Sequence, residues 1–93
     1  MRLTTKDTQA IKDIVFEFDD NAKTYLFGSR TDEGKRGGDI DLLIMSNILT
    51  CEDKRKIKLR LYDKLGEQKI DIIIAKDLEK PFVRIAYNEG VLL

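Results

Sequence analysis

Two aspartates, Asp39 and Asp41, open an apolar stretch that continues as Leu42-Leu43-Ile44. Residues two positions apart in a strand lie on the same face, so we expect these two carboxylates to project side by side. Adjacent carboxylates repel each other unless a cation lies between them, and strands are depleted in Asp. The spacing therefore predicts a divalent metal site, and Mg²⁺ suits it because Mg²⁺ prefers oxygen ligands.

A third aspartate, Asp71, lies in the apolar run Ile70–Ala75. The residues from Thr50 to about Leu65 predict a helix between the two apolar strands, and a strand-helix-strand crossover leaves its strands parallel. If the strands are neighbours, their starts lie at the same end of the sheet. We therefore expect Asp71 to converge with Asp39 and Asp41 as a catalytic residue and a metal ligand.

Gly28 and Ser29 follow directly after the residues 23–27, which predict a short buried strand. Gly28 allows close approach of the backbone to a triphosphate, and Ser29 offers a hydroxyl and an amide at the start of a helical turn, where anions bind. With Arg30 for charge neutralisation, these are the predicted nucleotide-binding residues. A hairpin loop over residues 30–38 would place them beside the first two carboxylates.

The same glycine-rich stretch, from Gly28 to Arg36, imitates a P-loop. However, Gly34-Lys35 comes one residue too late after Gly28, and Arg36 replaces the Ser or Thr that would hold Mg²⁺. We reject that interpretation. Gly28-Ser29 alone also fits an ordinary turn, and Asp71 alone fits an outward-facing strand position. The expected convergence of all the parts at one end of one sheet favours a functional site.

The composition limits the possible chemistry. Seventeen basic residues balance seventeen acidic ones, which weighs against direct nucleic-acid binding through a broad basic surface. There is no histidine and one cysteine, which excludes an internal disulfide, a His-based zinc site and a Ser-His-Asp triad. No signal pattern and no run long enough to cross a bilayer are evident, so we expect a cytoplasmic protein without membrane contact.

The elements predict a single domain, residues 1–93, of α/β (α+β) class. We expect an α-β-α-β-α order with a small mixed sheet of about three strands flanked by helices. Buried helical periodicity at Ile11, Ile14 and Val15 predicts the first helix. Pro81 fits the first position of a closing helix that places Phe82, Ile85 and Ala86 on one face.

The residues that could take part in catalysis or binding resemble, in type and order, the signature of the polymerase-β-type nucleotidyltransferases. The matching parts are Gly28-Ser29, the intervening residues 30–38, Asp39-Ile40-Asp41, and Asp71 in a later apolar strand. The whole chain resembles the minimal nucleotidyltransferases (MNT proteins) of prokaryotes that are paired with HEPN-domain partners.

Two positions depart from that pattern. Thr31 stands where a small residue such as alanine is common, and Gly38 stands where serine often precedes the first aspartate. Neither change removes a metal ligand, although Gly38 leaves the hydroxyl role to Ser29.

The resemblance implies a nucleotidyltransferase-like fold and Mg²⁺-dependent transfer of AMP from ATP. Two Mg²⁺ ions would clamp the attacking and leaving oxygens, with Asp39 and Asp41 bridging them and Asp71 on the nucleophile side. It also implies a role as an antitoxin that forms a complex with a HEPN-domain toxin and modifies one of its tyrosines.

Two alternatives stay open. One is a non-catalytic, nucleotide-binding antitoxin or regulatory subunit that masks its partner. The other is a transferase for a small hydroxylated molecule such as an antibiotic, which we rank lower because larger transferases of this kind resemble this chain plus an acceptor-binding domain. With 93 residues, the acceptor is expected to come from a partner.

Overall fold

The computed structural model describes residues 5–27, 39–66 and 69–93, with only the backbone of Asp39. Its elements are, in order, α1 (Thr5–Phe18), β1 (Lys23–Phe27), β2 (Asp39–Met45), α2 (Cys51–Leu65), β3 (Lys69–Ala75), α3 (Pro81–Glu89) and β4 (Val91–Leu92). The strands form one sheet in the order β3-β2-β1-β4. This arrangement confirms the expected mixed α+β class.

The strand directions agree with those expected from the sequence. β1 pairs antiparallel with β2, and β2 pairs parallel with β3 across the α2 crossover. The order of the described elements departs from the expected α-β-α-β-α in two places. Two strands, which form the hairpin that the loop between them led us to expect, follow one another between α1 and α2. A fourth strand, β4, was not expected; it follows α3 and pairs antiparallel with β1.

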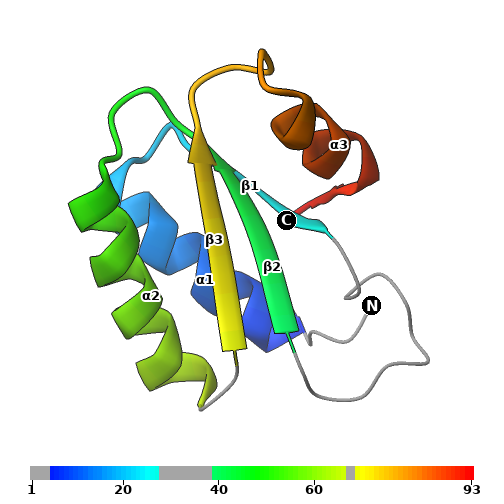
Figure 1. Ribbon diagram of the computed structural model, residues 1–93. Coiled ribbons are helices and arrows are strands. Elements are labelled where there is room, and N and C mark those ends of the chain that lie inside the picture. Colours follow the sequence, from blue (N-terminus) through cyan, green and yellow to red (C-terminus); the bar gives the residue numbers. More distant parts are fainter. Residues whose placement is uncertain (1–4, 28–38, 67–68) are drawn as a thin grey trace.

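The helices cover the two faces of the sheet unequally. Figure 1 shows α1 and α2 on one side of the sheet and α3 on the other. The larger core lies under α1 and α2, where each fully buried Ile or Leu stabilises the fold by roughly 1.5–3 kcal/mol. Its buried residues are Ile11, Ile14 and Val15 of α1, Ile57 and Leu61 of α2, and Leu26, Ile40, Leu42, Ile44, Ile70 and Ile72 of the strands.

Local signals fix the ends of α2. The Thr50 side chain accepts a hydrogen bond from the Asp53 amide at 3.2 Å, and the Asp53 carboxylate accepts one from the Thr50 amide at 3.0 Å. This capping box satisfies two amides that the helix cannot pair internally. The helix stops at Gly66, whose φ of 86° lies in the left-handed region that favours glycine.

The smaller core lies on the other face, under α3. Val83 and Ala86 are buried there against Leu43 of β2. The face expected from the sequence is therefore not the buried one. Ala86 is buried, but Phe82 and Ile85 are 62% and 57% exposed.

The connection from α3 to β4 is tight. A Cβ atom at Gly90 would lie 2.9 Å from the Ala86 carbonyl oxygen and 3.0 Å from the Tyr25 Cβ. Glycine therefore allows α3 to pass close to β1 and to continue directly into β4, where Leu92 pairs with Tyr25. The side of α3 that packs on Leu43 is the i, i+3 pair Val83 and Ala86, and Phe82, one residue before Val83, lies outside that contact.

Candidate active site

The parallel pairing of β2 and β3 brings two of the predicted site residues together. Asp41 and Asp71 are direct partners in the register. Neighbouring strands lie about 4.8 Å apart, so the two residues start from adjacent backbone positions. The crossover argument thus correctly predicts that these two carboxylates lie at the same end of the sheet.

Both aspartates belong to the face that carries α3. Leu42 is buried under α1 and α2, so its neighbour Asp41 shares the opposite face with Leu43. By the same alternation, Asp71 shares that face with Ile73. In Figure 1, α3 lies toward the end where β3 finishes, and the described helices leave the starts of β2 and β3 uncovered on this side. Asp71 is accordingly exposed and Asp41 is partly exposed.

The end of β1 approaches the same place. Phe27, the last residue of β1, is the antiparallel partner of Asp41. The chain that continues into Gly28 therefore leaves β1 directly beside the carboxylate strand. The antiparallel pairing of β1 with β2 is the one expected from the sequence, and the position of Gly28-Ser29 next to the aspartates stays a prediction.

The side chains of the other predicted site residues lie outside the part of the chain that the structure describes. Asp39 is the first residue of β2 and pairs with Lys69, but its side chain lies outside the described residues. Gly28, Ser29 and Arg30 lie outside them entirely. Within the described part of the chain, no three His, Cys, Asp or Glu side chains are grouped to hold a metal. The three-carboxylate site therefore stays a prediction.

Lys69 is a member of this face that the sequence interpretation missed. It is exposed, it precedes Asp71 by two residues and so shares its face, and its register partner is Asp39. The alternation from Lys69 to Asp71 was visible in the sequence. This alternation is not specific for a functional site, because an exposed lysine at a strand start also commonly protects a sheet edge from pairing.

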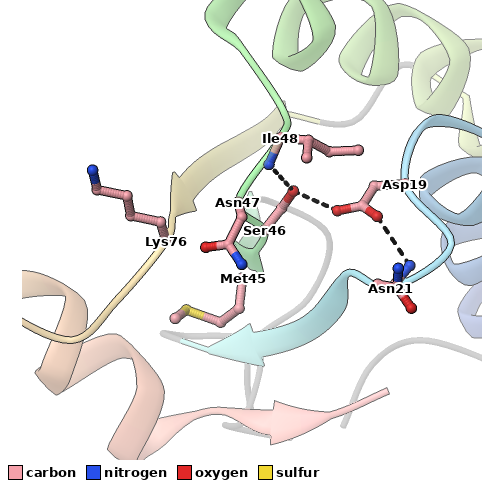
Figure 2. A pocket seen from close by; sticks show the side chains of 7 residues that line it. All are labelled: Asp19, Asn21, Met45, Ser46, Asn47, Ile48 and Lys76. Carbon is pink, nitrogen blue, oxygen red and sulfur yellow. Dashed lines mark hydrogen bonds between the residues drawn. The ribbon is translucent and has the colours of Figure 1, made fainter.

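The opposite end of the sheet contains a small hollow of about 260 Å³, shown in Figure 2. Here Asp19 is only 7% exposed. One of its carboxylate oxygens accepts a hydrogen bond from the Ser46 hydroxyl at 2.5 Å, and the other accepts one from the Asn21 amide at 3.0 Å. The Ser46 hydroxyl oxygen in turn accepts from the amides of Ile48 and Leu49. This network joins the end of α1 to the turn after β2, which is a structural role.

Tyr25 and Tyr87 pack against each other. Their ring centroids lie 5.0 Å apart. Burial, with a contribution from the Tyr87 hydroxyl, raises the pKa of Tyr25 above its ordinary value. Both effects favour the neutral phenol of Tyr25.

Comparison with known proteins agrees with this architecture. The model of the family described as "Polymerase beta, Nucleotidyltransferase" matches residues 9–93. The chain therefore belongs to the polymerase-β-type nucleotidyltransferase family, whose members typically use a nucleoside triphosphate and a divalent metal. No curated protein matches the chain.

None of the described helices is long and apolar enough to span a membrane.

Proposed function

We propose that the protein transfers AMP from ATP to a tyrosine hydroxyl of a HEPN-type toxin and thereby acts as its antitoxin. The observation that carries the transferase part is the direct pairing of Asp41 with Asp71 on an accessible face of the sheet. Membership of the nucleotidyltransferase family supports the reaction class. The resemblance of the chain to minimal nucleotidyltransferases supports the choice of partner.

The described residues fit a magnesium site in their chemistry. Asp41 and Asp71 supply hard carboxylate oxygens from adjacent strands, and Asp39 precedes Asp41 by two residues in the same strand. Mg²⁺ is held in such sites by one or two carboxylates and by substrate phosphates. When bound, the metal would neutralise charge on the phosphates and on the attacking oxygen. We assign Asp39, Asp41 and Asp71 as its ligands.

The reaction exchanges a phosphoanhydride bond of ATP for a phosphodiester bond that links AMP to the tyrosine. The tyrosine oxygen forms a bond to the α-phosphorus of ATP, and the bond from that phosphorus to the β-phosphate oxygen breaks. Pyrophosphate leaves, and the Asp71 carboxylate takes up the hydroxyl proton. The contribution of the fold is to hold nucleophile and leaving group in line. Gly28, Ser29 and Arg30 are the proposed binding residues for the triphosphate.

The alternative function is that of a masking subunit, which neutralises its partner without chemistry. The observation that favours it is the exposure of large apolar side chains on α3 and on β4. Large apolar side chains exposed together mark interaction sites. The described residues that contribute most are Phe82, Ile85 and Leu92, which are 62%, 57% and 57% exposed.

Co-expression with the candidate toxin separates the two functions. With the wild-type chain, the intact mass of the toxin should rise by one or more AMP groups. With Asp41→Asn, the toxin should keep its mass and still co-purify, because removing a metal ligand disturbs the transition state and leaves the association surface unchanged. If Asp41→Asn neutralised the toxin fully while the wild type left the toxin mass unaltered, the masking function would replace the transferase.

A further inference from the structure

β3 is an edge strand of the described sheet. Its seven residues pair with β2 on one side, and no described strand pairs with the other side. An unpaired edge presents backbone N–H and C=O groups that can bind an additional strand. Extended peptides bind many proteins in this way, with main-chain hydrogen bonds for affinity and side-chain pockets for specificity.

A hollow of about 500 Å³ lies beside the second half of β3, next to the start of α3. Its lining is mixed. The apolar part includes Ile73 of β3 and Phe82 and Val83 of α3, and the charged part comprises Lys76, Asp77, Glu79 and Lys80. Ile73 follows Asp71 by two residues, so it lies on the same face about 6.6 Å further along the strand. Phe82 is 62% exposed at this hollow. The apolar part of this hollow therefore lies further along β3, on the face that carries Asp71.

A cation lies on the other side of the carboxylates. Lys69 precedes Asp71 by two residues on the same face and is exposed. Along one face of the edge strand the order is therefore a positive charge, a carboxylate that serves the reaction, and the apolar part of the hollow. A bound strand would meet these features with side chains at alternate positions of its own, because opposite residues of paired strands share a face.

We propose that the free edge of β3 is the acceptor site, and that the acceptor is an extended peptide segment of a protein. Its hydroxyl residue lies opposite Asp71, an acidic residue two positions away lies opposite Lys69, and an apolar residue two positions in the other direction enters the hollow. The assignment of Asp71 to the reaction rests on the proposed function. A strand edge selects peptide over nucleic acid, because it pairs with backbone amides that a sugar-phosphate chain lacks.

Labelled peptides test this site by fluorescence anisotropy, without Mg²⁺ or ATP. The probe has a central Tyr, with Leu two positions to one side and Glu two positions to the other, and both orders are measured. Matched peptides replace Glu by Lys, or Leu by Ser. Wild-type protein should bind the Glu peptide about fivefold more tightly than the Lys peptide, as expected for an opposite-charge pair replaced by a like-charge pair.

Protein variants assign the contacts. Lys69→Glu should invert the preference and favour the Lys peptide, and Lys69→Gln should remove it. Phe82→Ser should weaken binding of the Leu peptide by about fivefold, because apolar area stays in water. Ile85→Ser is the matched control, since Ile85 is exposed to a similar degree and does not line the hollow. Both Lys69 and Phe82 are exposed, so these variants should fold.

Equal affinity of the wild type for the Glu and Lys peptides would overturn the proposal, as would no binding of any peptide or no inversion by Lys69→Glu. Tighter binding of a single-stranded oligonucleotide than of every peptide would also overturn it. AMP transfer is then measured separately. Peptide binding as expected without AMP transfer would leave the site in place and contradict the proposed reaction. AMP transfer to the toxin without peptide preference would retain the reaction and remove this site.

Discussion

An aspartate lies at each end of the sheet, and the surroundings of the two side chains differ. Asp19, at the end where β2 finishes, is 7% exposed, and both of its oxygens accept hydrogen bonds, from Ser46 and Asn21. Asp71, at the end where β3 starts, is exposed and lies opposite a second carboxylate, Asp41. The first carboxylate is compensated by the protein itself. The second is placed where a cation from outside can compensate it.

The surroundings of an aspartate distinguish a structural role from a chemical role more reliably than its residue type does. A buried charge is tolerated only when hydrogen bonds replace its lost hydration, and Asp19 meets that condition. Like charges directly opposite each other on adjacent strands destabilise a sheet. A fold that retains such a pair on an accessible face departs from local consistency, and such departures are expected at functional sites. The hydrogen bonds at Asp19 therefore hold the end of α1 to the turn after β2, and the face at Asp71 is the candidate active site.

The largest expected effect is on catalysis, and it should fall on one end only. Asp71→Asn should lower AMP transfer to the toxin by at least about a hundredfold, because charge stabilisation in the transition state is lost. Asp19→Asn should keep transfer per folded molecule within about threefold, because Asp19 lies away from the reacting groups. Mass spectrometry of the toxin over time measures both rates. Equal loss in both variants would remove the distinction between the two ends.

The next effect is on stability, and it should fall on the other end. Asp19→Ala should lower the free energy of unfolding by about 2–3 kcal/mol, because the Ser46 hydroxyl and the Asn21 amide lose their partner in a part-buried site. Asp20→Ala is the matched control at an exposed neighbouring position. Urea unfolding followed by circular dichroism gives both values. A loss below about 0.5 kcal/mol for Asp19→Ala would mean that this hydrogen-bond network does not stabilise the fold.

Ligand binding should give a smaller change. At a concentration ten times its Kd, MgATP should raise the free energy of unfolding by about 1.4 kcal/mol and the Tm by several degrees. Asp71→Asn should show little of this rise, whereas Asp20→Asn should show all of it. Differential scanning fluorimetry at millimolar MgATP measures the shift. An unchanged midpoint in the wild type would count heavily against a nucleotide site.

The end that holds the candidate site was the more predictable of the two. Its geometry follows from general rules: a crossover makes β2 and β3 parallel, and alternation fixes the faces of Asp41 and Asp71. Helix α2 was predictable because its capping box is local in sequence, with Thr50 and Asp53 three residues apart. These predictions needed no knowledge of tertiary contacts.

The remaining features depend on contacts between distant residues. The hydrogen bond from Ser46 to Asp19 spans 27 positions, so no local pattern reveals it. The exposure of Phe82 follows from the packing of Val83 and Ala86 on Leu43, a contact between residues about forty positions apart. Helical periodicity alone cannot decide between two apolar faces of a short helix, and the strand β4 contains only two residues.

The smallest expected effect is on the stability of the fold when the Asp71 carboxylate is neutralised. Without metal, Asp71→Asn should leave the free energy of unfolding unchanged or raise it by a few tenths of a kcal/mol, because it removes a like-charge pair across two strands. The gain should shrink as NaCl rises to 1 M, since salt screens exposed charges. Asp63→Asn, an exposed change on α2, is the matched control for a simple change in net charge. If Asp71→Asn instead lost more than about 1 kcal/mol in urea unfolding, its carboxylate would be part of the structure, as that of Asp19 is. The assignment of this end of the sheet to metal binding would then be wrong.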